Sequence, residues 1–444
     1  MFNAKLPSEL TSNWSSKLPY TGKLSIQRLP VEILCEIFFN SIADQPLNFA
    51  EEVWNSLDPM QAPWTLTRVC KSWRTVALAN QRIWCHIRLH LRPYGSARPS
   101  KRGPSPLALI LFLERSGSHP LYIHFGNSTT QLFHLLMSQS HRWREVSLYM
   151  PLPRLQLTSQ IHGRVPILRH LTIIHCLTAT GLTNALSTTS SPIRTFEVAP
   201  ELREVYLDIG DPRGMVLPWP QLTQVGGRFL HDLQFLKSAA NVVDLTVDAG
   251  SHPSTIRHER VRRLRVYGAA NLEWLDTPAL EELYIHAIPH PSSNNIRRTI
   301  AFIQQSSFAL TALTLRDIWI DNEVNARALL ESCPGLVQFH VSICGVAWNT
   351  LARLLTVTEH SCLLPKLQHL EILGRFLAHL DASIPGMLES RLRDRGKGMP
   401  KLKSISLVDV SVSPEDMNRL LELEKLGLCM SKTLRWVPRT QSLI

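Results

Sequence analysis

One apolar pattern recurs through residues 143–407 and constrains the fold more than any other feature of the chain. In each copy, an apolar residue is followed by a second one three positions later and by a third one five positions later. The clear copies are Leu168/Leu171/Ile173, Leu202/Val205/Leu207, Val242/Leu245/Val247, Val261/Leu264/Val266, Leu280/Leu283/Ile285, Leu310/Leu313/Leu315, Leu336/Phe339/Val341, Leu367/Leu370/Ile372 and Leu402/Ile405/Leu407. Trp143/Val146/Leu148 is a weaker copy, and Leu222/Val225 is a degenerate one that Gly226 and Gly227 interrupt. Alternate side chains of a strand share one face, so each copy predicts a short strand with one buried face.

A single copy cannot fold alone. Its three core side chains contribute roughly 1.5–3 kcal/mol each when buried. Fixing the backbone costs roughly 1–2 kcal/mol for every ordered residue. Neighbouring copies must therefore share a continuous core, and we expect the array to form one elongated domain.

The pattern resembles the leucine-rich-repeat family, in which Leu-x-x-Leu-x-Leu-x-x is followed by Asn or Cys. Cys176 and Cys344 occupy that last position, which the family places inside a turn. The longer C-terminal spacings leave room for helices behind the strands, which we expect over residues 296–305, 325–333, 348–357 and 414–423. The resemblance implies an irregular α/β solenoid.

Residues 29–84 have the period of helices instead. Val31, Leu34, Phe38 and Ile42 recur at helical spacing, with Ile33 and Ile37 in a second apolar row. Pro30 suits the first helical position. A second helix is predicted with Leu66, Val69, Cys70, Trp73 and Ala77 on one side. Two short helices cannot bury so many apolar side chains, so the excess indicates a partner surface.

This stretch resembles an F-box, because Leu29-Pro30, Glu32-Ile33-Leu34, Ile37-Phe38, Val69-Cys70-Lys71-Ser72-Trp73 and Trp84 follow that family's order. The phrase Leu113 to Leu121 further resembles the large fungal F-box family. The resemblance implies docking on a Skp-type adaptor and, through it, on a cullin. The matching contact positions are Leu29, Pro30, Glu32, Ile33, Leu34, Ile37, Phe38, Val69, Cys70, Trp73 and Trp84. The departure is residues 43–63, which are predicted to be an inserted loop. A helical hairpin that feeds the core of the next domain is the alternative.

The expected fold class is α/β, with an all-helical F-box module followed by the solenoid. The predicted segments are a lead-in at 1–23, the module at 24–91, a basic Pro/Gly linker at 92–106, a helix and strand at 107–140, the repeats at 141–430 and a tail at 431–444. No signal peptide or membrane-spanning run is recognisable, so a cytoplasmic or nuclear protein is expected. The eight cysteines are scattered and predict neither a zinc site nor disulfides.

No motif of an active site is present, and we expect neither an enzyme nor a cofactor. His258-Glu259 lacks the second His of a zinc protease, and Pro289 breaks the helix that would align His286 with His290. No metal site is therefore predicted. The net charge of +11 is spread out without an aromatic-interleaved stripe, which argues against a nucleic-acid binder.

The positions between the repeat's core residues should face outward and form a binding surface. The predicted substrate-binding residues are Tyr206, Arg265, Tyr267, Tyr284, His286 and Arg316. Arg and Tyr are common at binding hot spots, and Arg pairs with carboxylates and phosphates. An acidic or phosphorylated protein segment is the expected ligand; a solvated sheet face without a single ligand is the alternative. The predicted function is substrate recognition in a ubiquitin ligase, with a repeat scaffold acting outside any ligase as the alternative.

Overall fold

The computed structural model describes residues 29–43, 55–90, 105–126, 128–175, 192–210, 214–229, 233–248, 255–268, 272, 274–286, 295–305, 309–320, 322–345, 348–373, 383–392, 401–410 and 414–434. The chain is a mixed α/β protein that divides into two compact units. The first unit comprises residues 1–89 and 96–119, and the second comprises residues 90–95 and 120–444. No helix within the described ranges combines the length and the apolar character that crossing a membrane requires.

The first unit is mostly helical. Its elements are α1 (Val31–Ala43), η2 (Thr65–Arg68), α2 (Lys71–Ala79), η3 (Gln81–Trp84), β1 (His86–His90, which ends at the boundary) and α3 (Pro106–Arg115). The prediction of an all-helical module is therefore corrected by β1 and by an isolated antiparallel bridge between Asn55 and Leu89. Ile87 and Leu89 alternate into the core at 0% and 1% exposure, which is the burial pattern of a strand.

Trp84 forms the centre of the first unit's core. Its side chain is fully buried, and its ring centroid lies 5.1 Å from that of Trp64 and 5.1 Å from that of Phe112. Its Nε1 donates a hydrogen bond of 2.8 Å to the carbonyl of Ala77. The guanidinium of Arg115 lies 4.4 Å from the Trp84 ring centroid. α3 is thereby tied to the helices that precede it, although the sequence pattern assigned it to the junction with the repeats.

The helix α1 packs through one of its two apolar rows. Leu34, Phe38 and Ile42 are buried, and the Phe38 ring centroid lies 4.8 Å from that of Trp73 on α2. Val31, expected in the same row, is 56% exposed because it begins the helix, one turn before the first buried position.

The segment predicted as one helix around Trp73 consists of two elements. η2 ends at Arg68, and α2 begins at Lys71. Between them, Cys70 is extended (φ −156°, ψ 174°), and its Sγ accepts a hydrogen bond of 3.4 Å from the backbone N–H of Trp73. A side chain that caps a helix in this way sets the start of that helix, so the apolar stripe is interrupted at Cys70.

Part of the predicted inserted loop is bound to the core of the first unit. The Ser56 N–H donates to the carbonyl of Arg88 over 2.8 Å, and Nε1 of Trp64 donates to the Ser56 carbonyl over 2.8 Å. Leu57 is 3% exposed. Residues 44–54 of this loop lie outside the described residues.

The second unit is built on a parallel sheet. Its strands are β2 (Leu121–Gly126), β3 (Trp143–Tyr149), β4 (His170–Ile174), β5 (Glu204–Gly210), β6 (Gln224–Phe229), β7 (Asp244–Asp248), β9 (Arg263–Tyr267), β11 (Glu282–His286), β12 (Ala312–Ile320), β13 (Gln338–Gly345), β14 (His369–Leu373), β15 (Ser404–Val410) and β16 (Cys429–Leu434). They are neighbours in this order, and every pair is parallel. β8 (Ile256–Arg257) and β10 (Leu275–Asp276) form a separate two-stranded sheet. β16 continues past residue 431, where the tail was predicted to begin.

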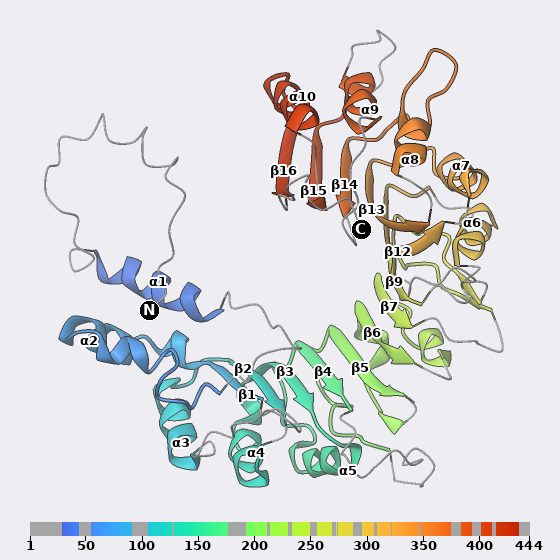
Figure 1. Ribbon diagram of the computed structural model, residues 1–444. Helices are drawn as coiled ribbons and strands as arrows, with labels where there is room; N and C mark the ends of the chain where they lie inside the picture. Colours follow the sequence, from blue (N-terminus) through green and yellow to red (C-terminus); the bar gives the residue numbers. More distant parts are fainter. Residues whose placement is uncertain are drawn as a thin grey trace, which may run out of the picture. The chain divides into compact units, whose positions relative to one another are not determined.

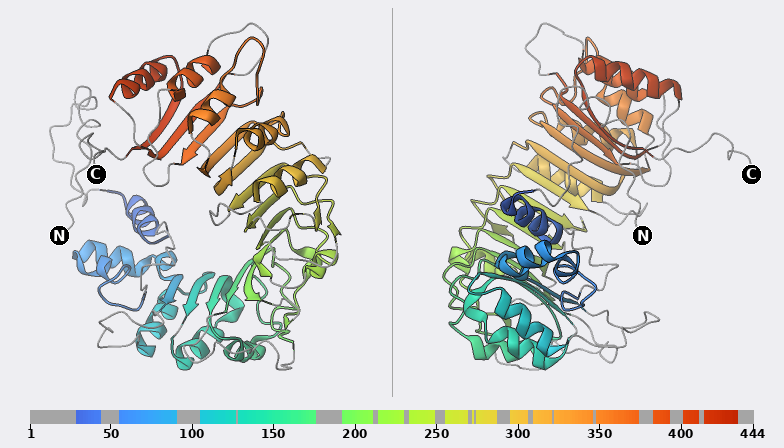
Figure 2. Two further views of the ribbon diagram at one scale, coloured as in Figure 1. Left: turned by 45° about the vertical axis from the view of Figure 1, so that its right-hand side comes forward. Right: turned by 90° about the vertical axis from the view of Figure 1, so that its left-hand side faces the viewer.

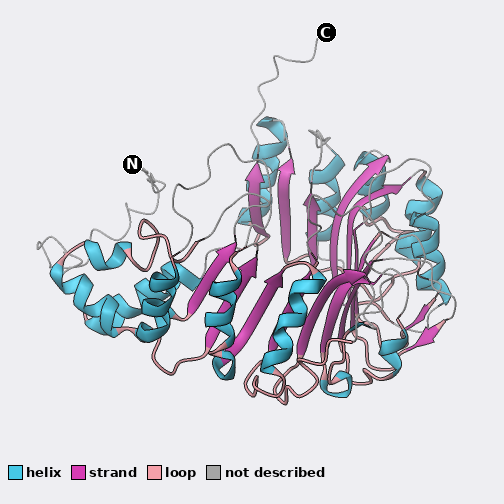
Figure 3. Cartoon of the chain, turned by 90° about the horizontal axis from the view of Figure 1, so that it is seen from below, coloured by secondary structure: helices cyan, strands magenta, loops and turns pink. Residues whose placement is uncertain are grey.

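Helices cover one face of this sheet (Figure 1). They are α4 (Thr130–Met137), α5 (Leu152–Leu155), α6 (Asn295–Gln305), α7 (Glu323–Glu331), α8 (Trp348–Leu355), α9 (Ser383–Leu392) and α10 (Pro414–Lys425), with short turns η4 (Ser140–Arg142), η5 (Gln156–Ile161), η7 (Trp219–Gln221) and η8 (Gln234–Lys237). In Figure 2 the helices α6 to α10 lie on the outer side of the strands, and Figure 3 shows the opposite face without helices over its described part. That opposite face is called the open face below.

The core lies between the strands and these helices. No residue of the clear repeat copies is more than 3% exposed, and the weak copy at Trp143 is equally buried. Corresponding positions are in register, as for Leu283 with Leu264 on one side and Leu313 on the other. Helices α6, α7, α8 and α10 occupy predicted positions, whereas α4 and α9 were not predicted. Cys176 lies outside the described residues, and Cys344 lies in β13.

Candidate partner-binding surfaces

The first unit exposes large apolar side chains on several elements, among them Leu78 on α2 and Leu107 and Leu111 on α3. Leu29, Ile33 and Ile37 are 37%, 48% and 41% exposed; Ile33 and Ile37 are four residues apart on one side of α1, and Leu29 lies two residues before that helix begins. This set is called the exposed row. Val69, between η2 and α2, is 59% exposed. Pro30 and Glu32 are also exposed. A contiguous apolar row at the surface is typical of a protein-binding site.

The other predicted adaptor contacts have internal roles. Leu34, Phe38 and Trp84 are no more than 2% exposed and hold the unit together. Trp73 is half-buried against Phe38, and Cys70 caps α2. Ile33 and Ile37 each precede a buried residue by one position, which is about 100° around a helix. The sequence motif therefore contains both a core row and a surface row.

The open face of the second unit brings together five of the six predicted residues. Arg265 on β9 is the register partner of Tyr284 on β11, and His286 is the register partner of both Tyr267 and Arg316. The Tyr267 ring centroid lies 6.1 Å from that of Tyr284 and 5.8 Å from that of His286. These five residues are called the Tyr–His–Arg cluster.

The sixth residue, Tyr206, lies farther along the sheet on β5, with β6 and β7 between it and Arg265. A Cβ at Gly226 would lie 2.8 Å from Cδ2 of Tyr206 and 3.2 Å from Cβ of Thr246. The Tyr206 ring therefore packs over the glycine of β6. This contact accounts for the glycine at 226, whereas the apolar residue that the degenerate copy at Leu222 lacks would stand at 227.

A buried carboxylate holds two arginines of the open face. Asp244 has a side chain that is only 5% exposed, and its Oδ1 accepts from Nη1 of Arg265 over 2.9 Å. Its Oδ2 accepts from Nε of Arg263 over 3.0 Å. Asp244 precedes a core leucine, as many surface residues of strands do, so its burial is not predictable from the repeat pattern. Arg265 is consequently part of an internal ion pair as well as a surface residue.

A second buried carboxylate orients the histidine of the cluster. Asp317 is 2% exposed, and its Oδ2 lies 3.1 Å from Nε2 of His286 while its Oδ1 accepts from Oγ of Ser342 over 3.3 Å. Asp317 has a positive φ of 58° at the irregularity in β12, where one extra residue enters the strand. Regular alternation would turn the residue after Arg316 toward the core, and a bulge re-aims side chains, so Asp317 lies beside His286 of the open face instead.

Tyr284 lies on the middle strand of the cluster, and Arg316 lies on the neighbouring strand β12. Burial raises the pKa of the Tyr284 hydroxyl, and the positive charge and hydrogen bond of Arg316 oppose this rise. Arg316 is exposed, so its guanidinium is held over the sheet and also faces solvent. This geometry suits recognition of an anionic group.

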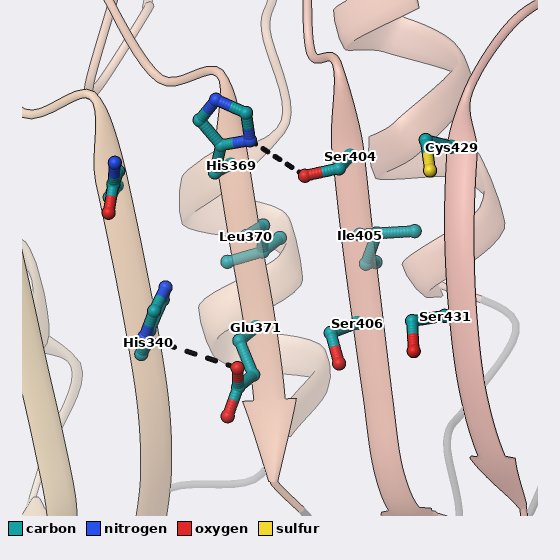
Figure 4. A pocket seen from close by; sticks show the side chains of 10 residues that line it. His340, His369, Leu370, Glu371, Ser404, Ile405, Ser406, Cys429 and Ser431 are labelled. Atoms are coloured by element: carbon teal, nitrogen blue, oxygen red, sulfur yellow. Dashed lines mark hydrogen bonds and ion pairs between the residues drawn. The ribbon is translucent and has the colours of Figure 1, made fainter. Parts of the chain in front are cut away.

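A hollow of about 270 Å³ opens on the same face over β13 to β16 (Figure 4). Its lining residues are Gln338, His340, His369, Leu370, Glu371, Ser404, Ile405, Ser406, Cys429 and Ser431. Nδ1 of His369 lies 2.7 Å from Oγ of Ser404, and Nδ1 of His340 lies 4.0 Å from Oε2 of Glu371. We call it the β13–β16 hollow. Its polar residues are not among the predicted substrate-binding residues, although they occupy the same alternate strand positions as the cluster.

The hollow does not have the geometry of a catalytic triad. His369 and Ser404 are at hydrogen-bonding distance, but Glu371 pairs with His340, and no carboxylate of the described residues bonds His369. A general base needs an orienting group of that kind to activate a serine. Over the described part of the chain, no group of three His, Cys, Asp or Glu residues could hold a metal ion.

Comparison with known proteins gives no family assignment. A scan against protein-family models found no match, and a search of the curated proteins found none either.

Proposed function

We propose that this chain is the substrate-recognition subunit of a Skp–cullin–F-box type ubiquitin ligase. The exposed row carries the proposal, because a helix that follows the F-box order presents Ile33 and Ile37 to solvent at 48% and 41% exposure. Leu29, Pro30, Glu32, Ile33, Ile37 and Val69 would contact the Skp-type adaptor. Leu34, Phe38, Cys70, Trp73 and Trp84 would keep this surface in shape.

The second unit would be the substrate-binding part, as an irregular leucine-rich-repeat solenoid. The Tyr–His–Arg cluster would hold an acidic or phosphorylated segment, with Arg316 as the main anion contact because Asp244 already pairs with Arg265. No chemistry is required of this chain. Its contribution would be the effective concentration of substrate beside the ubiquitin-conjugating enzyme.

Affinity purification of the full chain from cells tests the proposal. We expect recovery of the Skp adaptor and a cullin, and loss of both with Leu29→Ala combined with Pro30→Ala. Recovery of neither protein with the unsubstituted chain would contradict the ligase role. Recovery of the adaptor without a cullin would favour a scaffold that acts outside the ligase.

The substrate half of the proposal has a separate test. Proximity labelling with the full chain should identify proteins that disappear with Arg316→Glu, while adaptor recovery stays unchanged. Arg316 is preferable to Arg265 for this purpose, because a glutamate at 265 would face the buried Asp244 and threaten folding. An unchanged set of labelled proteins would contradict the role of the cluster.

A further inference from the structure

We propose that the β13–β16 hollow is a subsite for an arginine side chain of the partner segment. The inference rests on the proposed function, in which the open face holds a protein substrate. It adds a second recognition element to the Tyr–His–Arg cluster, with the opposite charge preference.

The first observation is the charge of the residues that line the hollow. Glu371 is the only Asp, Glu, Lys or Arg among its ten described lining residues. Its side chain is 30% exposed, and its pairing with His340 spans 4.0 Å. The chain as a whole has a net charge of +11, so an acidic hollow does not follow from the composition. A positively charged group is the complementary occupant.

The second observation is the shape of the hollow. Apart from the buried Ile405, β15 and β16 present small side chains there, namely Ser404, Ser406, Cys429 and Ser431, whereas β14 presents the larger His369 and Glu371 (Figure 4). The small residues form the floor, and the larger ones form a wall. The floor offers hydroxyl oxygens as acceptors beside the carboxylate. A guanidinium has five N–H donors and a planar edge that fits a carboxylate, so arginine uses this set of acceptors better than lysine does.

Other occupants fit less well. An acidic or phosphorylated residue would be repelled by Glu371. A sugar ring usually stacks on an aromatic side chain, and no Phe, Tyr or Trp is among the described lining residues. An apolar side chain would meet only Leu370 and Ile405, which are themselves buried at 2% and 1% exposure.

The spacing of the two sites gives the partner segment a pattern. Arg316 lies on β12 and Glu371 on β14, two strands away and one alternate position apart in register. Strand spacing then separates them by roughly 10–12 Å, which an extended chain covers in about three or four residues. We therefore expect an acidic or phosphorylated residue in the partner and an arginine about three or four positions from it.

Two pools of short peptides test the subsite on the immobilised full chain. Both pools have random flanking positions, and the fixed central residue is arginine in one and citrulline, its neutral isostere, in the other. We expect the arginine pool to be retained about ten-fold more than the citrulline pool, because a charge-assisted hydrogen bond is made only by the cation. Equal retention of the two pools would overturn the proposal.

Substitutions should identify the residue that causes the preference for the arginine pool. Glu371→Gln keeps the size of the side chain and should make the retention of the two pools about equal. A neutral amide does not discriminate between the guanidinium of arginine and the neutral end group of citrulline. Glu282→Gln is the matched control, since Glu282 is exposed on β11 in the same row as Gln338 but outside the hollow. A preference that survives Glu371→Gln, or that Glu282→Gln lowers equally, would overturn the assignment.

Adaptor capture, measured on the same preparations, separates this inference from the proposed function. Glu371→Gln should leave adaptor capture unchanged. If the unsubstituted chain captured no adaptor, the ligase role would fail while the arginine preference would still be decided by its own ratio.

Discussion

Nε2 of His286 lies 3.1 Å from Oδ2 of Asp317, a carboxylate that is only 2% exposed. Placing a charge under a sheet face is costly unless the charge is paired. The same arrangement recurs at Asp244 beneath Arg263 and Arg265. Both carboxylates fix the position of a basic side chain on the open face, which reduces the entropy that a ligand would otherwise have to overcome.

Substitution of Asp317 should separate its backbone role from its charge. We expect Asp317→Ala to lower the free energy of unfolding by about 2–4 kcal/mol, because it removes two hydrogen bonds and strains a positive φ. Asp317→Asn should cost clearly less, since Asn tolerates this conformation and still offers an oxygen acceptor. Urea unfolding followed by tryptophan fluorescence provides the comparison. An Asn variant as unstable as the Ala variant would contradict this account.

The buried Asp244 carboxylate should be tolerated only because it is paired with Arg263 and Arg265. Arg263→Gln with Arg265→Gln should lower the free energy of unfolding by about 2–4 kcal/mol, discounted for the partial exposure of the arginines. Adding Asp244→Asn should recover a large part of this loss, because the unpaired buried charge is then gone. A triple variant no more stable than the double variant would show that Asp244 is not held by these partners.

The Tyr206 ring, and not the strand that contains Gly226, should be what disfavours a larger residue at position 226. Gly226→Ala places a Cβ 2.8 Å from the tyrosine ring, and we expect it to cost about 1–3 kcal/mol. In a Tyr206→Ala background the same substitution should cost at least about 1 kcal/mol less. Thermal or urea unfolding of the four proteins in this cycle gives the coupling. Additive effects would rule out the proposed contact.

His86 makes stability depend on pH in the first unit. Burial, with smaller contributions from Arg88 and Arg82, lowers the pKa of His86 from 6.5 to about 4. Above pH 6.5 the residue is neutral in both states and has no effect. Below it, the unfolded state takes up a proton first, so stability falls between pH 6.5 and about 4. The total loss of unfolding free energy across this pH window is on the order of 3 kcal/mol.

The control for this prediction is His86→Gln, which cannot be protonated. The difference in unfolding free energy between the two proteins should shift in favour of the variant as the pH falls through this window. A difference that stays constant with pH would mean that His86 is protonated equally in both states.

The strands of the second unit were largely predictable, because every clear repeat copy places three apolar residues on one buried face. The same period identified Arg265, Tyr267, Tyr284, His286 and Arg316 as neighbours. The carboxylates beneath them were not predictable. Asp244 occupies an ordinary outward position, and Asp317 meets His286 only because of a bulge that the apolar pattern does not reveal.

The helical unit was harder to predict for a physical reason. Helical spacing identified two apolar rows on α1 but could not tell which one packs against the core. Cys70 was read as part of an apolar stripe, although its sulfur caps α2. The strand β1 was missed because it is short and carries Arg88 among its buried residues.

The central claim is that the exposed row binds a Skp-type adaptor, whereas the buried Leu34, Phe38 and Trp84 support the unit. The most direct measurement is the dissociation constant of the purified full chain for that adaptor, by isothermal titration calorimetry. Ile33→Ala combined with Ile37→Ala should weaken binding by about ten-fold or more, because two apolar contacts are lost, and should leave the unfolding free energy nearly unchanged. Leu421→Ala is the matched control, because Leu421 on α10 is 41% exposed, as Ile37 is. Binding that is equally strong in both variants, or absent from the unsubstituted chain, would contradict the account.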